Sequence, residues 1–237
     1  MNGTAIKICG LRDQAAVEAV AALGDRIRYA GFVFAESRRR VTPEAVRRLD
    51  LTRLAARRVG VFVDPDPALV RAAVEAASLE ALQFSGDEPP EVVEAYRRTW
   101  GLSVIKAMDA AAGPEAAERW LGGGRPPFDI LLLDVRRPGA FGGTGTAFDW
   151  EMIPEWQAFA RAYGLSLWVA GGLRPETVGA LVRRFRPDGV DVSSGVETGG
   201  QKDAAKIRRF VEAVAAAEAV TTEATDAGSR GETAPPR

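Results

Sequence analysis

The sequence predicts an α/β fold, a single-domain (β/α)8 TIM barrel over residues 1–218. Short apolar runs of strand length alternate strictly with longer amphipathic runs, and each kind occurs eight times. Most short runs are apolar on both faces, which is typical of a parallel sheet covered on both sides. Strands that alternate with helices form βαβ units, and eight such units are typical of a closed barrel.

The elements follow one another in order along the chain. Strands are predicted at residues 4–9, 29–34, 58–63, 79–84, 102–107, 128–134, 166–171 and 189–194. Helices are predicted at residues 12–23, 42–49, 66–77, 89–100, 113–121, 150–164, 174–185 and 202–218. Thr42 before Pro43 and Asp66 before Pro67 mark helix starts, because proline suits the first helical position. An open doubly wound sheet is the alternative, but its glycine-rich first turn is replaced here by "CGLRD".

The last segment of the chain differs in composition from the rest. Residues 219–237 read "AVTTEATDAGSRGETAPPR", which is polar and has no apolar period. A segment of this kind buries too little apolar surface to fold alone, so the sequence predicts a disordered tail over 219–237.

Composition excludes several functions. The chain has 31 basic and 32 acidic residues, so it lacks the basic excess of nucleic-acid binders. No apolar run reaches the length of a membrane span, and the start of the chain does not read as a signal segment, so we expect no membrane partner. A single cysteine forms no internal disulfide and fits a cytoplasmic protein. Without any histidine, histidine-dependent triads are impossible, and one cysteine cannot supply the usual ligands of a structural zinc site, so we expect no metal.

Active sites of such barrels lie at the carboxyl ends of the strands. Those ends carry a small set of chemically useful residues: Cys9, Arg38–Arg40, Asp64, Gln83, Ser85, Lys106, Asp134, Gly171, Gly172, Asp191, Ser193 and Ser194. The glycine-bearing loops "AGGLRPE" and "DVSSGVETGG" follow the last two strands, where barrels often bind phosphate through backbone N–H groups. A third glycine-rich stretch, "FGGTGTAFDW", follows the sixth strand.

Each polar candidate has a structural and a chemical interpretation. Cys9 is either a small buried hydrophobe or, with no histidine available, a thiolate base. Asp134 is a cap, an ion-pair partner or a general acid whose pKa is raised by its apolar surroundings. Asp191 is a partner for Lys7 or a site residue. The arginines of "SRRRVTPE" form a solvated loop or bind a substrate carboxylate.

Several long motifs resemble the phosphoribosylanthranilate isomerase family of tryptophan biosynthesis. They are "KICGLRD", "GFVFAESRRRVTPE", "VGVFVD", "LLLDVRRPGAFGGTGTAFDW", "AGGLRPETV" and "VDVSSGVETGGQKD", in the family's order over roughly residues 5–212. The resemblance implies a (β/α)8 barrel that converts N-(5-phosphoribosyl)anthranilate to 1-(2-carboxyphenylamino)-1-deoxyribulose 5-phosphate without cofactor or metal. It implies a small-molecule phosphoribosyl substrate, no nucleic-acid or membrane partner, and a monomer or homodimer.

The resemblance also implies roles for individual residues. Cys9 of "KICG" matches the family's general base, and Asp134 matches its general acid. Arg39 matches the arginine that binds the anthranilate carboxylate, with Arg38 or Arg40 possible if the loop shifts by one residue. The remaining matches are substrate contacts at Gln83, Gly143 and Asp191, and phosphate contacts at Gly171, Gly172, Ser193, Ser194 and Gly195.

One motif departs from the family pattern. The family usually reads "QLHG" after the fourth strand, whereas this chain reads "QFSG", with Ser85 in place of the histidine. This leaves room for a shifted substrate. A related isomerase of histidine biosynthesis uses aspartates on strands one and five, where this chain has Cys9 and Lys106. A non-catalytic phosphosugar-binding barrel is the third hypothesis, and the retention of Cys9 and Asp134 disfavours it.

Overall fold

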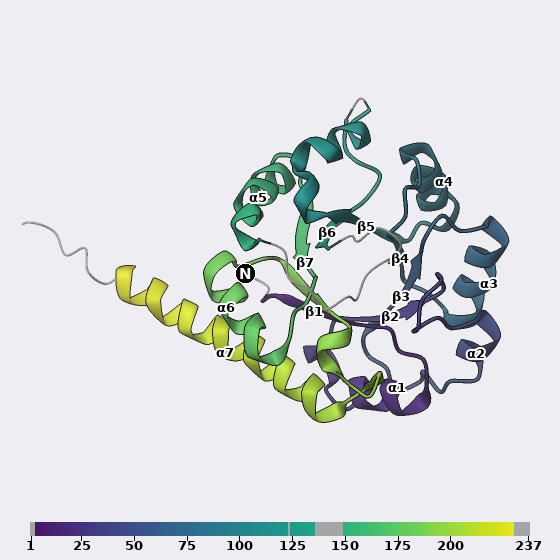
Figure 1. Ribbon diagram of the computed structural model, residues 1–237, viewed down its shortest axis with the longest axis horizontal. Coiled ribbons are helices and arrows are strands. Elements are labelled where there is room, and N and C mark those ends of the chain that lie inside the picture. The colour runs from purple at the N-terminus through teal and green to yellow at the C-terminus, as the bar shows by residue number, and fades with distance from the viewer. Residues whose placement is uncertain (1–2, 123, 136–148, 230–237) are drawn as a thin grey trace, which may run out of the picture.

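The fold is a closed barrel of eight parallel strands in sequence order, as the sequence predicts (Figure 1). The computed structural model describes residues 3–122, 124–135 and 149–229, and side chains to residue 220. The strands are β1 (Ala5–Cys9), β2 (Tyr29–Val33), β3 (Arg57–Phe62), β4 (Ala81–Phe84), β5 (Ser103–Asp109), β6 (Ile130–Asp134), β7 (Ser166–Val169) and β8 (Gly189–Val192). The first and last strands close the barrel by pairing in parallel, with Lys7 opposite Asp191.

Helices surround the barrel (Figure 1). The α-helices are α1 (Gln14–Ala21), α2 (Pro43–Arg47), α3 (Pro67–Ala77), α4 (Pro90–Trp100), α5 (Ile153–Ala162), α6 (Pro175–Phe185) and α7 (Ala204–Ser229). Thr42 and Asp66 cap α2 and α3 with side-chain oxygens, each directly before a proline, which confirms the predicted starts. A short hairpin, β9 (Glu197–Thr198) with β10 (Gln201–Lys202), precedes α7.

The helix predicted at 113–121 is a 3-10 helix, η3 (Pro114–Trp120), rather than an α-helix. Its buried residues are Ala117 and Trp120, three positions apart. With three residues per turn, the 3-10 geometry places both on one face, which suits a short connector better than an α-helical turn.

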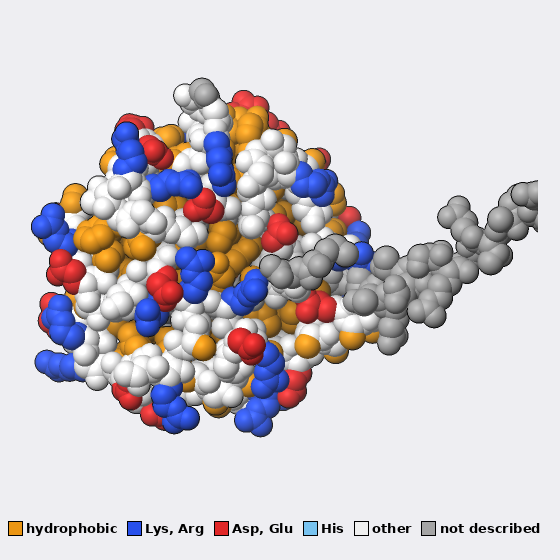
Figure 2. Space-filling view, turned by 180° about the vertical axis from the view of Figure 1, so that it is seen from behind, with side chains coloured by type: hydrophobic (Ala, Val, Ile, Leu, Met, Phe, Trp, Pro, Cys, Tyr) orange, Lys and Arg blue, Asp and Glu red, His pale blue; other side chains and the backbone are white. Residues whose placement is uncertain are grey.

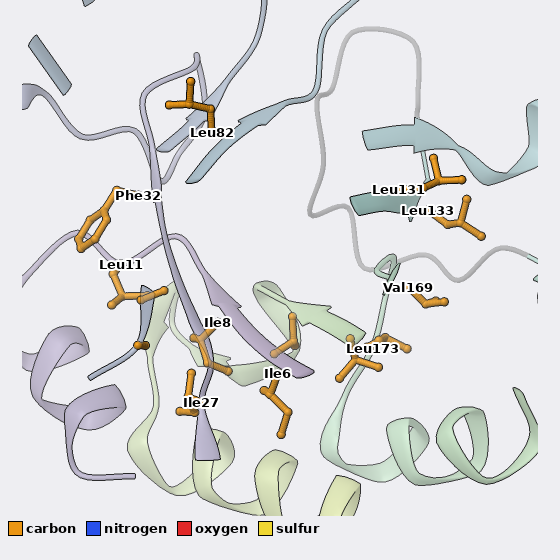
Figure 3. Close-up of a cluster of buried hydrophobic side chains, with 14 of the residues drawn as sticks. Ile6, Ile8, Leu11, Ile27, Phe32, Leu82, Leu131, Leu133, Val169 and Leu173 are labelled. Carbon is orange, nitrogen blue, oxygen red and sulfur yellow. The ribbon is translucent and has the colours of Figure 1, made fainter. Parts of the chain in front are cut away.

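The strands bury apolar side chains on both faces. Ile6 and Ile8 of β1 point outward into the layer between barrel and helices, together with Leu131 and Leu133 of β6 (Figure 3). Alternate residues of the strands form a second, smaller cluster inside the barrel that includes Ala5, together with Val59, Ala81, Ile105, Ala107, Ile130, Leu132, Trp168 and Ala170. This double burial explains why the strands lack a polar face.

Helix α7 is longer than the sequence predicts. It continues past residue 218 to Ser229, so residues 219–229 are helical where disorder was expected, and Figure 1 shows its end projecting beyond the barrel. Between Ala204 and Ala227 this segment contains neither glycine nor proline, and it is rich in alanine, the residue with the highest helix propensity. The helix therefore has no local stop signal until Gly228. Residues 230–237 lie outside the described residues.

The surface carries charges of both signs. Figure 2 shows basic and acidic side chains interspersed over one face, with hydrophobic side chains between them, in line with a net charge of −1. Among the described helices, none combines the length and apolar character needed to cross a membrane.

Candidate active site

A pocket of about 730 Å³, counting its open mouth, lies at the carboxyl ends of the strands. Its walls include seven of the residues that the sequence singled out: Cys9, Arg39, Gln83, Ser85, Asp134, Asp191 and Ser193. Val33, Val61 and Met108 supply apolar wall between them. Residues from seven of the eight strands or the loops after them therefore meet in one cavity, as expected for a barrel whose parallel strands end at the same rim.

Cys9 ends β1 and is 7% exposed. Its register partner on β2 is Gly31, where an added Cβ would lie 3.0 Å from the Cys9 sulfur. Glycine at this position therefore makes room for the thiol. Burial raises the pKa of Cys9 above its usual value, although the positive charges of Lys7 and Lys202 act in the opposite direction.

Asp134 ends β6, directly after four buried residues. Its carboxylate accepts a hydrogen bond of 2.7 Å from the backbone N–H of Val135. Burial raises the pKa of Asp134 to about 6, and the nearby negative charge of Asp191 adds to the rise. The direction agrees with the expectation from its apolar surroundings. A carboxyl group with this pKa is partly protonated near neutral pH and can donate a proton.

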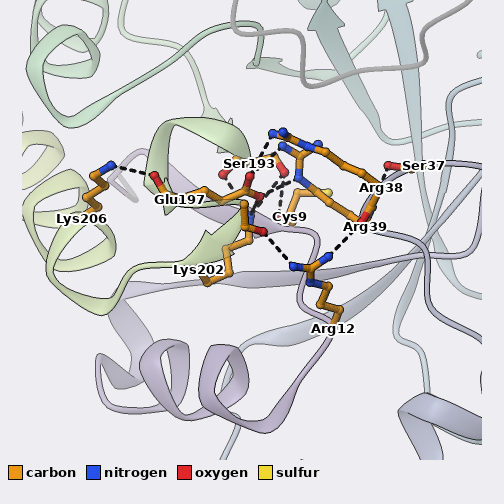
Figure 4. A network of polar contacts seen from close by, with 10 residues as sticks. Cys9, Arg12, Ser37, Arg38, Arg39, Ser193, Glu197, Lys202 and Lys206 are labelled. Carbon is orange, nitrogen blue, oxygen red and sulfur yellow. Dashed lines mark hydrogen bonds and ion pairs between the residues drawn. The ribbon is translucent and has the colours of Figure 1, made fainter.

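Arg39 is the arginine of the basic loop that reaches the pocket. Its Nε donates to Glu197 Oε1 at 2.6 Å and its Nη2 donates to Glu197 Oε2 at 3.0 Å (Figure 4). Gly10, at φ +86°, allows this approach, because a Cβ there would lie 2.5 Å from Arg39 Cδ. Of the two neighbouring arginines, Arg38 is mostly exposed but also donates to Glu197 Oε2 at 3.1 Å, and Arg40 pairs with the exposed Glu36.

Glu197 and Lys202 are site residues that the sequence reasoning missed. Lys202 donates to Glu197 Oε1 at 2.8 Å and to the backbone oxygen of Ser193 at 3.0 Å (Figure 4). Burial raises the pKa of Glu197, but hydrogen bonds from Arg39 and Lys202 outweigh it and lower the pKa to about 2. Glu197 is therefore ionised at neutral pH and holds both cations in place. No local motif predicts the cluster of Arg39, Glu197 and Lys202, because Glu197 and Arg39 are 158 residues apart in the sequence.

Gln83 and Ser85 line the wall that β4 contributes. Gln83 Nε2 donates to Ser85 Oγ at 3.1 Å. Gln83 Oε1 is buried and has no hydrogen-bond partner in the structure. A buried acceptor without a donor is costly, so this oxygen is suited to an N–H or O–H group of a ligand.

The predicted phosphate residues lie in two neighbouring loops beside the pocket. Gly171 and Gly172 follow β7 with φ of +77° and +71°, and α6 begins three residues later at Pro175. Ser194 and Gly195 lie in η5 (Ser194–Val196), after β8. Of the predicted phosphate residues, Ser193 alone lines the pocket. Gly143, a predicted substrate contact, lies outside the described residues.

The comparison with known families agrees with this arrangement. The family described as N-(5'-phosphoribosyl)anthranilate (PRA) isomerase matches residues 6–213, which run from β1 into α7.

The chain belongs to the PRA isomerase family.

Relatives of known name support this membership. A PRA isomerase of Desulforudis audaxviator is 44% identical over 215 residues, covering 88% of this chain and 96% of the relative. A Thermotoga maritima structure, titled as monomers generated from a dimeric PRA isomerase, is 32% identical with a TM-score of 0.71, covering 90% of this chain and 99% of that one. A PRA isomerase in complex with reduced 1-(o-carboxyphenylamino)-1-deoxyribulose 5-phosphate is 31% identical with a TM-score of 0.70 and the same coverage.

In this PRA isomerase family member, the two loops after β7 and β8 are packed closely together. A Cβ added at Gly195 would lie 1.8 Å from the backbone oxygen of Leu173. We expect Gly195→Ala to lower the thermal unfolding midpoint by about 5 °C or more, because roughly 2 kcal/mol of overpacking corresponds to several degrees in a chain of this size. Calorimetry measures the shift.

The matched control is Gly122→Ala, since a Cβ at Gly122 meets nothing within 4 Å. We expect Gly122→Ala to have the same thermal unfolding midpoint as the unmodified protein. An equal midpoint for both variants would show that the contact between the two loops has no role in stability.

The described residues offer no metal centre. No group of three or more cysteine, aspartate or glutamate side chains among them is arranged to hold a metal ion.

Proposed function

We propose that this chain catalyses the Amadori rearrangement of N-(5'-phosphoribosyl)anthranilate in tryptophan biosynthesis, with Cys9 as general base and Asp134 as general acid. Family membership makes the chain an isomerase. The observation that carries the assignment of roles is the shared pocket, in which the thiol of β1 and the carboxyl group of β6 are both available to one ligand.

The two groups match the two proton transfers of the reaction. Asp134 donates a proton to the furanose ring oxygen, and the ring opens to a Schiff base. The Cys9 thiolate then takes the C2' proton, and the electron pair of that C–H bond forms the double bond of an enolamine. Tautomerisation of the enolamine gives the ketone. A carboxyl group with a pKa of about 6 retains a proton for the first step, and each positioned group contributes about 10²–10⁴ in rate.

Other pocket residues would hold the substrate. Arg39 is fixed by Glu197 through Nε and Nη2, which leaves Nη1 outside that pair and suited to the anthranilate carboxylate. Gln83 Oε1 would accept a hydrogen bond from the substrate's amine or a hydroxyl group. Asp191 lines the same pocket, its charge acts on both Cys9 and Asp134, and it would contact the sugar. The loops with Gly171, Gly172, Ser193, Ser194 and Gly195 would bind the phosphate.

The test is turnover by the purified protein. We expect formation of 1-(2-carboxyphenylamino)-1-deoxyribulose 5-phosphate from N-(5'-phosphoribosyl)anthranilate, and no turnover of the phosphoribosyl aminoimidazole used in histidine biosynthesis. The reverse preference would overturn the proposal and point to the pocket wall at Ser85. Binding of both compounds without turnover would favour a non-catalytic phosphosugar-binding barrel.

Glu197 is expected to act on substrate binding through Arg39. In Glu197→Gln, the amide nitrogen faces a guanidinium donor, so Arg39 loses one of its two fixed contacts. We expect KM to rise about tenfold, equivalent to ~1.4 kcal/mol of binding free energy, with a smaller change in kcat. Steady-state kinetics with N-(5'-phosphoribosyl)anthranilate measure both constants.

Glu80→Gln is the matched control for this variant. Glu80 also pairs with an arginine, Arg58, at 3.0 Å, but it directly precedes β4 and lies at the opposite end of the barrel. We expect its KM to equal that of the unmodified protein. A tenfold rise in both variants would assign the effect to general destabilisation.

A further inference from the structure

Lys7 is a completely buried lysine inside the barrel. It is 0% exposed and lies two residues before Cys9 on β1, so both side chains point to the same face of the strand. Its Nζ lies 3.0 Å from Asp191 Oδ1 on the neighbouring strand β8. Lys7 itself is not among the residues that line the pocket, whereas Cys9 and Asp191 are. The ammonium group therefore lies behind two pocket residues and reaches a ligand only through them.

The Lys7 side chain contacts both of these neighbours. It donates a hydrogen bond of 3.0 Å to Asp191, and Cys9, two residues along on the same strand face, is the other group that acts on it. Burial lowers the pKa of Lys7, but Asp191 and Cys9 outweigh this effect and raise the pKa above its usual value. The amine is therefore a stable ammonium ion at neutral pH, and one of its partners is the sulfur of the proposed base.

Structural stability alone does not explain a buried lysine at this position. Taking an ammonium ion and a carboxylate out of water is costly, and apolar residues of similar volume often replace such pairs without loss of stability. The contact with Cys9 offers another explanation, because a positive charge beside a thiol favours the thiolate.

Several charged groups surround Cys9 from different elements. They are Lys7 on β1, Asp191 on β8, Lys202 on β10, and the pocket residues Arg39 and Asp134. Lys7 is the strongest influence that favours the thiolate, chiefly through the attraction of its positive charge. Lys202 acts in the same direction, and Asp191 acts against it.

We infer that Lys7 is the positioning residue for the proposed base: its buried ammonium group, held by Asp191, donates a hydrogen bond to the Cys9 sulfur and stabilises the thiolate that takes the C2' proton. This inference rests on the proposed function, since it assigns Lys7 a part in that reaction. It predicts an effect on kcat rather than on KM, because Lys7 does not line the pocket.

The ionisation of Cys9 can be measured without turnover. Cys9 is the only cysteine in the chain, so thiolate absorbance and alkylation by iodoacetamide report on this one group. In Lys7→Met we expect the apparent pKa of Cys9 to rise by about one unit or more, with alkylation at a fixed pH roughly tenfold slower. We expect kcat to fall with the thiolate fraction while KM changes little.

Two further variants separate the contact from simple disruption of the fold. Lys7→Met leaves the Asp191 carboxylate buried without its partner, which itself disfavours both the thiolate and the folded state. The double variant Lys7→Met with Asp191→Asn removes both charges, and we expect its Cys9 pKa to stay above that of the unmodified protein. Asp191→Asn alone keeps the ammonium and removes the opposing charge, so we expect the Cys9 pKa to fall.

The matched control is Lys106→Met with Glu88→Gln. Lys106 is another lysine in a buried ion pair among the described residues, 2.6 Å from Glu88, and it is not among the charges acting on Cys9. We expect this control to leave the Cys9 titration unchanged.

Each outcome bears on a different statement. An unchanged Cys9 titration in both variants that lack Lys7 would overturn the inference. A rise of the Cys9 pKa in Asp191→Asn would overturn it as well. The expected shifts in a protein that does not turn over N-(5'-phosphoribosyl)anthranilate would support the effect of Lys7 on the thiol and count against the proposed function alone.

Discussion

Cys9→Ala is expected to lower kcat for N-(5'-phosphoribosyl)anthranilate by about 10²–10⁴, the range typical of a lost general base. With no histidine in the chain, no imidazole can replace the thiolate. KM should stay close to that of the unmodified protein, because the thiol acts in the chemical step and not in ground-state binding. Steady-state kinetics measure both constants.

Two variants distinguish loss of the base from loss of packing. Cys9→Ser keeps nearly the same volume but replaces the thiol by a far weaker acid, so we expect it to be almost as inactive as Cys9→Ala. Val33→Ala shortens an apolar side chain that packs against Cys9 in the same pocket, and we expect it to retain most of its activity. A Cys9→Ser enzyme with near-normal kcat would remove the thiolate from the mechanism.

Asp134→Asn is expected to lower kcat by a similar factor and to change the pH profile. The active form needs a protonated Asp134 and an ionised Cys9. Burial raises the pKa of Asp134 to about 6 and raises that of Cys9 above its usual value, so Asp134 ionises first as pH rises. In the unmodified protein, kcat/KM should rise up to about pH 6, stay level, and fall again above the Cys9 pKa.

In Asp134→Asn, the ionisation near pH 6 is removed. The residual kcat/KM should then keep rising with pH until Cys9 has ionised, without levelling near 6. A residual profile that still levels near pH 6 would show that another group causes that ionisation.

As pH rises toward 6, the contribution of Asp134 to folding stability should fall while kcat/KM rises. Because folding raises the Asp134 pKa from 3.8 to about 6, the protonated form is favoured in the folded state. This contribution is complete below pH 3.8 and is lost as pH rises through about 6. Asp134→Asn removes a buried charge, so we expect it to raise the thermal unfolding midpoint at neutral pH and to have little effect below pH 3.8.

The sequence by itself determined the barrel and most of the residues in its pocket. Strand and helix periods are local properties, so the alternation of apolar and amphipathic runs was sufficient to predict eight parallel strands. The rule that parallel strands end at one rim then placed Cys9, Gln83 and Asp134 in a common site. The apolar residues before Asp134 also indicated the direction of its pKa shift, which the structure confirms.

Local pattern was less informative where tertiary packing sets the geometry. The 113–121 segment has a composition typical of an α-helix. In the structure it forms a 3-10 helix between β5 and β6, in which Ala117 and Trp120 are buried. At the C-terminal end of the chain, the polar composition after residue 218 suggested disorder, whereas helix α7 continues to Ser229.

Only the tertiary structure decided which charges meet. The closure of β1 on β8 sets the register that places Lys7 opposite Asp191, 184 residues away. The same closure brings the hairpin after β8 against the loop after β2, where Glu197 fixes Arg39 and Lys202. Ion pairs of this kind form only where segments that are remote in sequence bring their charged atoms to within about 3 Å, as Lys7 and Asp191 do at 3.0 Å. No local sequence period encodes such distances. The charged groups that act on the Cys9 thiol could therefore be identified only from the tertiary structure of the closed barrel.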